Sequence, residues 1–291
     1  MPIFDQSYRA YTGTRTGRAA RIASIAWMGV RPPLKKRAFL LLLLVGLAPF
    51  VYRFVLLFLA DYANAFNLPT QLGPGRSILP TSTDAEYFHS FLFGQRYVLF
   101  VLTVWAGAGL VSDDIASGAL PLYLSRPVGK LDYVVGKLMT LLVLGAVVTA
   151  APVLLLWLLL ATKAVGTGQA PPLAIGLRSL LAAFGMMLVY DLLMLAISSL
   201  SGSWRVAGIA FTALFLVSSV VSQVLRAVPV PGASLVSLGQ VLETSGRIVF
   251  GLAPRAEDPD WVPLASVLVL AGYLGLSALV LWARISSRSR P

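Results

Sequence analysis

The sequence predicts an all-α, polytopic membrane protein with six transmembrane helices and with both its N-terminus and its C-terminus in the cytoplasm. Composition is the first reason: of 291 residues, 57% are hydrophobic and only 12% are charged, and the mean hydropathy is +0.81. Six long apolar runs are the second reason, and the uneven distribution of Lys and Arg between the connecting segments is the third. Because soluble domains carry about 25% charged residues, this composition argues against a soluble fold.

Residues 1–37 form a basic segment, with eight Lys and Arg residues against one acid, Asp5. A secretory signal would place a short apolar core soon after its charged region. Here the apolar run comes late, at residues 39–60, and as a helix its 22 residues would measure about 33 Å. We therefore expect an uncleaved first transmembrane helix, preceded by a cytoplasmic or interfacial segment that anionic lipid attracts electrostatically.

Residues 38–284 are expected to form one six-helix transmembrane domain. The third apolar run has 28 residues, about 42 Å as a helix, so this helix should tilt or project from the membrane. Pro49 and Pro152 lie inside the first and third helices, where membrane proteins tolerate proline and where it can kink a helix. The short connection 201–205 predicts that helices four and five are a tight antiparallel pair. The five helices after the first are expected at residues 91–111, 134–161, 180–200, 206–225 and 264–283.

The orientation follows from the positive-inside rule. With the N-terminus inside, 15 of the 23 Lys and Arg residues lie on the cytoplasmic side, six lie outside, and two fall within helices. The loop 112–133 and a short tail, 285–291, are then cytoplasmic, whereas loops 61–90 and 226–263 are outside. The second outer loop contains an apolar stretch, 235–252, that should form short helices on or in the outer leaflet.

Several kinds of chemistry are missing from the sequence. The chain has no cysteine and one histidine, His89, which we expect to be an interfacial or surface imidazole rather than part of a metal site. The adjacent acids Asp113 and Asp114 point apart on a helix and are interpreted as solvated charges. No Walker A loop and no catalytic serine motif occur. We therefore expect no catalytic residue, no metal site and no cofactor in this chain.

Two charged residues lie deep within predicted membrane helices, far from the helix ends. Arg53 lies about 21 Å along the first helix, and Asp191 lies about 14 Å from the inner end of the fourth. An unpaired charge at this depth is costly. Either the two side chains pair directly, or Arg53 extends outward and Asp191 is protonated or lines a wet cavity.

The net charge of +11 would suit either nucleic acid or an anionic membrane surface. The high mean hydropathy favours the membrane surface over nucleic acid. We therefore expect membrane lipid but no nucleic acid among the partners. The expected location is a cell membrane, taken as the bacterial inner membrane.

The most informative segment is the loop 112–133. It leaves the second helix, turns at Gly118, carries a short apolar run and breaks at Pro127 before the third helix begins near Lys130. An apolar run on the cytoplasmic side is unfavourable unless it meets lipid or another protein.

This segment resembles the first cytoplasmic loop of permease subunits of ATP-binding-cassette exporters of the second type. The six-helix plan, the basic N-terminal segment and the large final outer loop are also similar to that family. The residues that match the loop pattern are Asp114, Gly118, Ala119, Leu120, Leu124, Ser125, Arg126, Pro127, Tyr133, Gly136 and Lys137.

The resemblance implies a permease subunit that forms the translocation path, pairs with a second copy or a homologue, and couples to a separate ATPase subunit. ATP and magnesium would then be bound by that partner. In the family the loop is a coupling helix that docks on the ATPase. The residues expected to serve this coupling are Asp114, Gly118, Leu120, Leu122, Tyr123, Leu124, Arg126 and Pro127.

Two other interpretations remain open at this point. The chain could be a polytopic membrane enzyme or assembly factor acting on lipid or cell-envelope precursors, for which a cluster of His, Asp and Glu would be expected. The loop 112–133 could also be an ordinary loop with a helix lying on the membrane surface. The sequence does not indicate the transported substrate.

Overall fold

The computed structural model describes residues 17–66, 85–119, 129–166, 168, 172–228 and 230–287, and no strand occurs in these ranges. The helices in chain order are α1 Arg18–Leu34, α2 Arg37–Ala65, α3 Ala85–Gly94, α4 Arg96–Ala116, α6 Lys130–Val148, α7 Ala150–Gly166, α8 Leu173–Leu200, α9 Trp204–Ala227, η1 Ala233–Val236, α10 Leu238–Phe250 and α11 Val262–Ser287.

The six-helix membrane fold predicted from the sequence is confirmed within these ranges. Six helical segments are long and apolar enough to cross a membrane. Large apolar side chains along α2, α9 and α11 are exposed, which suits contact with lipid. The six segments are Arg37–Ala60, Ala85–Ala116, Lys130–Val148, Leu173–Leu200, Trp204–Ala227 and Val262–Ser286.

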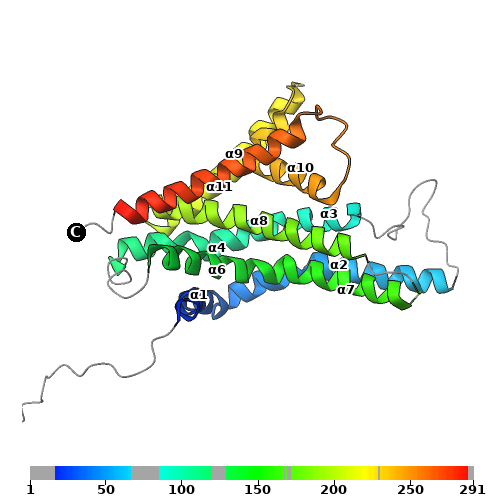
Figure 1. Cartoon of the computed structure of the whole chain (residues 1–291), viewed down its shortest axis with the longest axis horizontal. Coiled ribbons are helices and arrows are strands. Elements are labelled where there is room, and N and C mark those ends of the chain that lie inside the picture. The colour runs from blue at the N-terminus through cyan, green and yellow to red at the C-terminus, as the bar shows by residue number, and fades with distance from the viewer. Residues whose placement is uncertain are drawn as a thin grey trace, which may run out of the picture.

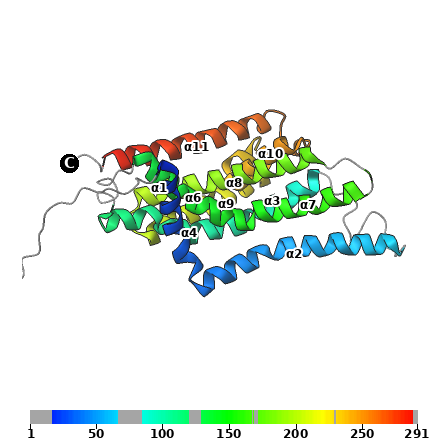
Figure 2. The ribbon, with the colours of Figure 1, turned by 60° about the horizontal axis from the view of Figure 1, so that its bottom comes forward.

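The long helices run side by side along one axis, whereas α1 lies across it (Figures 1 and 2). Figure 1 shows α1 nearly end-on, and the last turns of α4, α8 and α11 lie towards the same end of the bundle. We call this the terminal end. At the opposite end lie α3, α10 and the last turns of α7 (Figure 1).

The core of the bundle lies between α4, α6 and α8, which pack against one another. A serine joins two of them through backbone groups: the hydroxyl of Ser198 in α8 donates to the carbonyl of Ala108 at 2.8 Å. The same oxygen accepts from the backbone N–H of Ser112 at 3.0 Å. Polar side chains of this kind hold helices together where the lipid offers no competing partner.

The third predicted helix differs from the structure. Instead of one helix over residues 134–161, α6 ends at Val148 and α7 begins at Ala150, with Thr149 at φ −119° and ψ −69° between them. Pro152 explains this break, because proline has no N–H and its ring collides with the carbonyl four residues earlier, which belongs to Val148. By contrast, α2 continues through Pro49.

Two further predictions about connections are confirmed. Only residues 201–203 separate α8 from α9, and these two helices contact each other as the short connection predicts. The apolar stretch 235–252 forms short helices, η1 and α10, and α10 packs on α11, α8 and α3. The second predicted helix begins earlier than expected, since α3 precedes α4 with only Gln95 between them.

Candidate functional site

The two ends of the loop 112–133 are described by the structure, whereas residues 120–128 are not. The predicted anchors Leu120, Leu122, Tyr123, Leu124, Arg126 and Pro127 therefore lie outside the described residues. At the near end, α4 stops at Ala116 and Gly118 adopts a left-handed conformation with φ +67°, which favours glycine. The predicted turn at Gly118 is confirmed.

A cluster of three side chains joins the two ends of the loop. The hydroxyl of Tyr133 in α6 donates to Oδ2 of Asp114 in α4 at 2.7 Å. Nζ of Lys137, one turn further along α6, lies 2.7 Å from the same oxygen. The ammonium group also lies 5.5 Å from the centre of the Tyr133 ring. We call Asp114, Tyr133 and Lys137 the loop clamp.

The loop clamp is largely removed from solvent. The side chains of Lys137 and Asp114 are 10% and 18% exposed, so the interpretation of Asp114 as a solvated charge is wrong. The carboxylate is held because α4 and α6 pack together and place both partners on the facing side. Asp113 points the other way and is exposed, as neighbouring positions on a helix require.

Helix α1 crosses the first turns of α6 beside the loop clamp. Nε of Arg18 lies 2.6 Å from Oδ1 of Asp132, whose other oxygen accepts from the backbone N–H of Gly129 at 3.4 Å. Gly136 permits the crossing, because a Cβ atom there would lie 2.6 Å from Cγ2 of Ile25. From Arg18 to Leu34 the N-terminal segment is thus a helix packed on α6. The sequence predicted only a basic segment attracted to the membrane surface.

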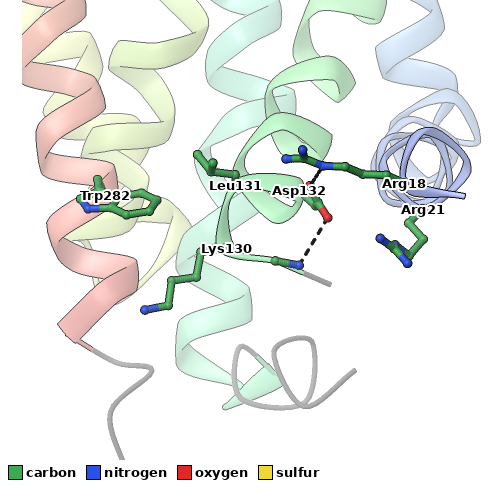
Figure 3. Close-up of a pocket in the computed structure, with 7 residues that line it drawn as sticks. Arg18, Arg21, Lys130, Leu131, Asp132 and Trp282 are labelled. Carbon is green, nitrogen blue, oxygen red and sulfur yellow. Dashed lines mark hydrogen bonds and ion pairs between the residues drawn. The ribbon is translucent and has the colours of Figure 1, made fainter. Parts of the chain in front are cut away.

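An open hollow of about 450 Å³ lies between α1 and α11 at the terminal end. Figure 3 shows α1 on one side and α11 on the other, with the first turn of α6 between them. Its lining residues are Arg18, Arg21, Gly129, Lys130, Leu131, Asp132 and Trp282.

The two intramembrane charges do not pair with each other. Nη2 of Arg53 donates to the hydroxyl of Ser90 at 3.2 Å, and the guanidinium lies 4.6 Å from the centre of the Tyr87 ring. Asp191 is fully buried and accepts from the hydroxyl of Thr103 at 3.2 Å. Its second oxygen has no hydrogen-bond partner in the part of the chain that the structure describes. Direct pairing is thus wrong, and Arg53 instead reaches α3 near the opposite end.

A second polar cluster lies at the opposite end and was not predicted from the sequence. Oε2 of Glu243 in α10 lies 2.7 Å from Nη1 of Arg96, and Oε1 contacts Nη2 of Arg255. Burial alone raises the pKa of Glu243, but the hydrogen bonds and charges of the two arginines outweigh it and hold the pKa below its ordinary value. The three residues come from separate parts of the chain, so no local pattern marks them.

His89 belongs to the same region. It is 2% exposed, and its Nε2 lies 3.1 Å from the backbone carbonyl oxygen of Glu243. The expectation of a surface imidazole is therefore wrong, because α10 covers the ring. Within the described ranges, no group of three or more His, Asp or Glu residues is placed to hold a metal ion.

Comparison with known proteins agrees with the membrane fold. Residues 23–244, more than half of the chain, match the family model described as ABC-2 family transporter protein. The match covers α1 from residue 23 onward, the loop 112–133 and the first half of α10, to residue 244. No curated protein matches the sequence.

Proposed function

Because the chain belongs to the ABC-2 family of transporter proteins, we propose that it is the permease subunit of an ATP-driven exporter that couples to a separate ATPase. The chain contributes the transmembrane helices that form the translocation path. ATP and magnesium are bound by the partner, since this sequence has no Walker A loop. A second copy or a homologue completes the path.

The loop clamp is the observation that supports this proposal best. Its members Asp114, Tyr133 and Lys137 are positions at which the sequence matches the coupling loop of such permeases. They lie up to 23 residues apart in the chain, yet both α6 side chains bind one carboxylate oxygen. A loop held at its base transmits a push on its tip to both helices that it connects.

Transmission from the loop proceeds through contacts that the described helices make. Closure of the ATPase displaces the loop 112–133, and the loop clamp moves the ends of α4 and α6 together. The hydrogen bonds of Ser198 with Ala108 and Ser112 pass the movement from α4 to α8. Repacking of two such bundles against each other then opens the path alternately to the two sides of the membrane. In this arrangement the terminal end faces the cytoplasm.

The coupling proposal is tested with Tyr123→Ala combined with Arg126→Ala. Aromatic and arginine side chains dominate many interfaces, at about 2 kcal/mol or more each. We expect the double variant to insert and fold normally but to lose most ATPase co-purification and transport together. A matched control removes an exposed aromatic–arginine pair from α1 at the same end, Trp27→Ala with Arg31→Ala, whose side chains stack at 5.0 Å.

The control pair should retain both ATPase association and transport. If the Tyr123 and Arg126 variant also retains both in full, the loop 112–133 is only a surface loop and the proposed coupling is wrong.

A further inference from the structure

We propose that the hollow between α1 and α11 binds the phosphate group of an anionic phospholipid. Two of its cations carry the argument. Nε of Arg21 is buried and has no hydrogen-bond partner within the described residues. Lys130 likewise makes no ion pair with any residue that the structure describes. Arg18 is different, because it forms an ion pair with Asp132, whose charge acts on Arg21 only at longer range.

The charge of the hollow favours an anion. Arg18, Arg21 and Lys130 contribute three positive charges, and Asp132 is the only acid among the lining residues that the structure describes. Arg21 and Lys130 line the hollow without an ion pair within the described residues, so a phosphate group there would neutralise their charge. Arginine and lysine are the side chains that most often bind phosphate.

The depth of the hollow in the membrane favours a lipid over a soluble anion. The span of α6 begins at Lys130, and the span of α11 ends at Ser286, one turn beyond Trp282. Helix α1 lies across the bundle at the same level (Figures 1 and 3). The hollow is therefore at the boundary between water and hydrocarbon, where tryptophan is enriched.

The lining also provides a route for the acyl chains. Leu131 and Trp282 are each 51% exposed and flank the cationic part of the hollow. A volume of about 450 Å³ suits a headgroup with its glycerol, while the acyl chains would continue along these two side chains into the membrane. This binding is independent of the proposed coupling to an ATPase.

The test uses the full chain in mild detergent, titrated with phosphatidylglycerol or phosphatidylcholine, with bound lipids counted by native mass spectrometry. We expect the first lipid to bind much more tightly when it is phosphatidylglycerol than when it is phosphatidylcholine. Each cation near an anionic headgroup contributes a factor of about five in affinity. Arg21→Gln with Lys130→Gln should therefore weaken phosphatidylglycerol binding about 25-fold and leave phosphatidylcholine binding unchanged.

A matched control removes two positive charges from the same region outside the hollow, Arg31→Gln with Lys35→Gln. Its phosphatidylglycerol binding should stay within about twofold of the parent, since each exposed charge lies outside the site. If this control loses as much binding as the first pair, general surface charge explains the attraction and the site is refuted. Lys130→Gln alone, expected to lose about fivefold, replaces the double variant if the latter does not fold.

Two further arms separate the sources of phosphate. Excess inorganic phosphate should not displace phosphatidylglycerol, because it lacks the apolar contacts with Leu131 and Trp282. Displacement would show a soluble anion site and overturn the lipid assignment. Loss of ATPase association without loss of lipid binding in the Arg21 and Lys130 variant would identify an acidic protein surface as the occupant instead.

Discussion

Asp114 is the residue on which the base of the loop 112–133 depends, because two side chains of α6 bind the same carboxylate oxygen. Removing either charge leaves the other in a site with little access to water. Neutralising either Asp114 or Lys137 alone should therefore lower the free energy of unfolding. The loss should exceed the small contribution that an exposed ion pair makes to stability. The energetic role of this residue follows from its partners rather than from its position in the sequence.

A double-mutant cycle measures this interaction. Asp114→Asn and Lys137→Met should each lower the free energy of unfolding by about 2 kcal/mol, because each leaves a poorly hydrated partner. The combined variant should lose less than the sum, with a coupling of about 1 kcal/mol or more. Thermal and denaturant unfolding of the purified chain, followed by tryptophan fluorescence, provides the values.

Asp113 supplies the control for this cycle. It adjoins Asp114 but is exposed, so Asp113→Asn should change the free energy of unfolding by less than about 0.5 kcal/mol. Strict additivity of the Asp114 and Lys137 substitutions would contradict the loop clamp.

At the scale of elements, the crossing of α1 over α6 depends on a missing side chain at Gly136. A Cβ atom there would lie 2.6 Å from Cγ2 and 2.7 Å from Cβ of Ile25. Gly136→Ala should displace α1 and make it more susceptible to limited proteolysis, with a loss of about 1–3 kcal/mol. Combining it with Ile25→Ala should restore part of the contact.

Gly185 is the matched control for this substitution, since it lies in α8 with open space around the position of a Cβ atom. Gly185→Ala should leave α1 protected and leave stability unchanged or slightly raised, because alanine is the better helix former. Equal proteolysis of the two variants would argue against a specific crossing at Gly136.

The anchoring of α10 should depend on pH through Glu243. Its pKa in the folded protein is held below the ordinary value near 4.3. The stabilisation from its two arginine partners is therefore fully present above that value and is lost as the pH falls through the folded pKa. We expect thermal stability from this contact to be constant between pH 7 and about 5 and to decline below.

Glu243→Gln should lower stability at pH 7 by about 1.5–3 kcal/mol and flatten the decline in acid. Glu257→Gln is the control, because this side chain is 80% exposed and faces Arg226 at 3.8 Å. If the stability of the Glu243→Gln variant still declines in acid as that of the parent does, Glu243 is not the group responsible for the decline.

The elements were predictable where the signal is local, and the contacts between them were not. Long apolar runs gave the six spans, because hydrocarbon thickness sets the length of a spanning helix. The break before Pro152 also has a local cause, but the sequence interpretation expected a kink within one helix. Glu243 and its partners Arg96 and Arg255 could not be found, since their contacts depend on how α10 folds back onto α3 and α4.

The candidate site was predicted in part. The motif pointed to Asp114, Tyr133 and Lys137 by residue type, yet nothing in their spacing showed that they contact one another. Asp191 and Arg53 were identified as intramembrane charges, but separation along two helix axes does not determine which faces those helices present. Thr103 and Ser90, their actual partners, are common residue types without a sequence signal.

At the scale of the whole molecule, the proposed orientation makes a prediction about accessibility. With the terminal end in the cytoplasm, Ser77→Cys should react with an impermeant thiol reagent in intact cells, because loop 61–90 is then outside. Ser24→Cys and Ser287→Cys should react only after the membrane is opened. The chain contains no cysteine of its own, so each variant reports a single site.

Labelling of residue 24 or 287 in intact cells, with residue 77 protected, would reverse the orientation. It would then also place the loop 112–133 on the wrong side for an ATPase.

The loop clamp also has an entropic consequence. It joins positions 19 residues apart, and closing a chain of that length costs roughly 2.6 kcal/mol in conformational entropy. In the folded protein the two ends are already joined before any partner binds, so this closure cost does not weaken the binding of the loop. A free peptide with the same residues would have to bring its own ends together on binding. It should therefore compete for the same partner surface about two orders of magnitude more weakly than the intact chain.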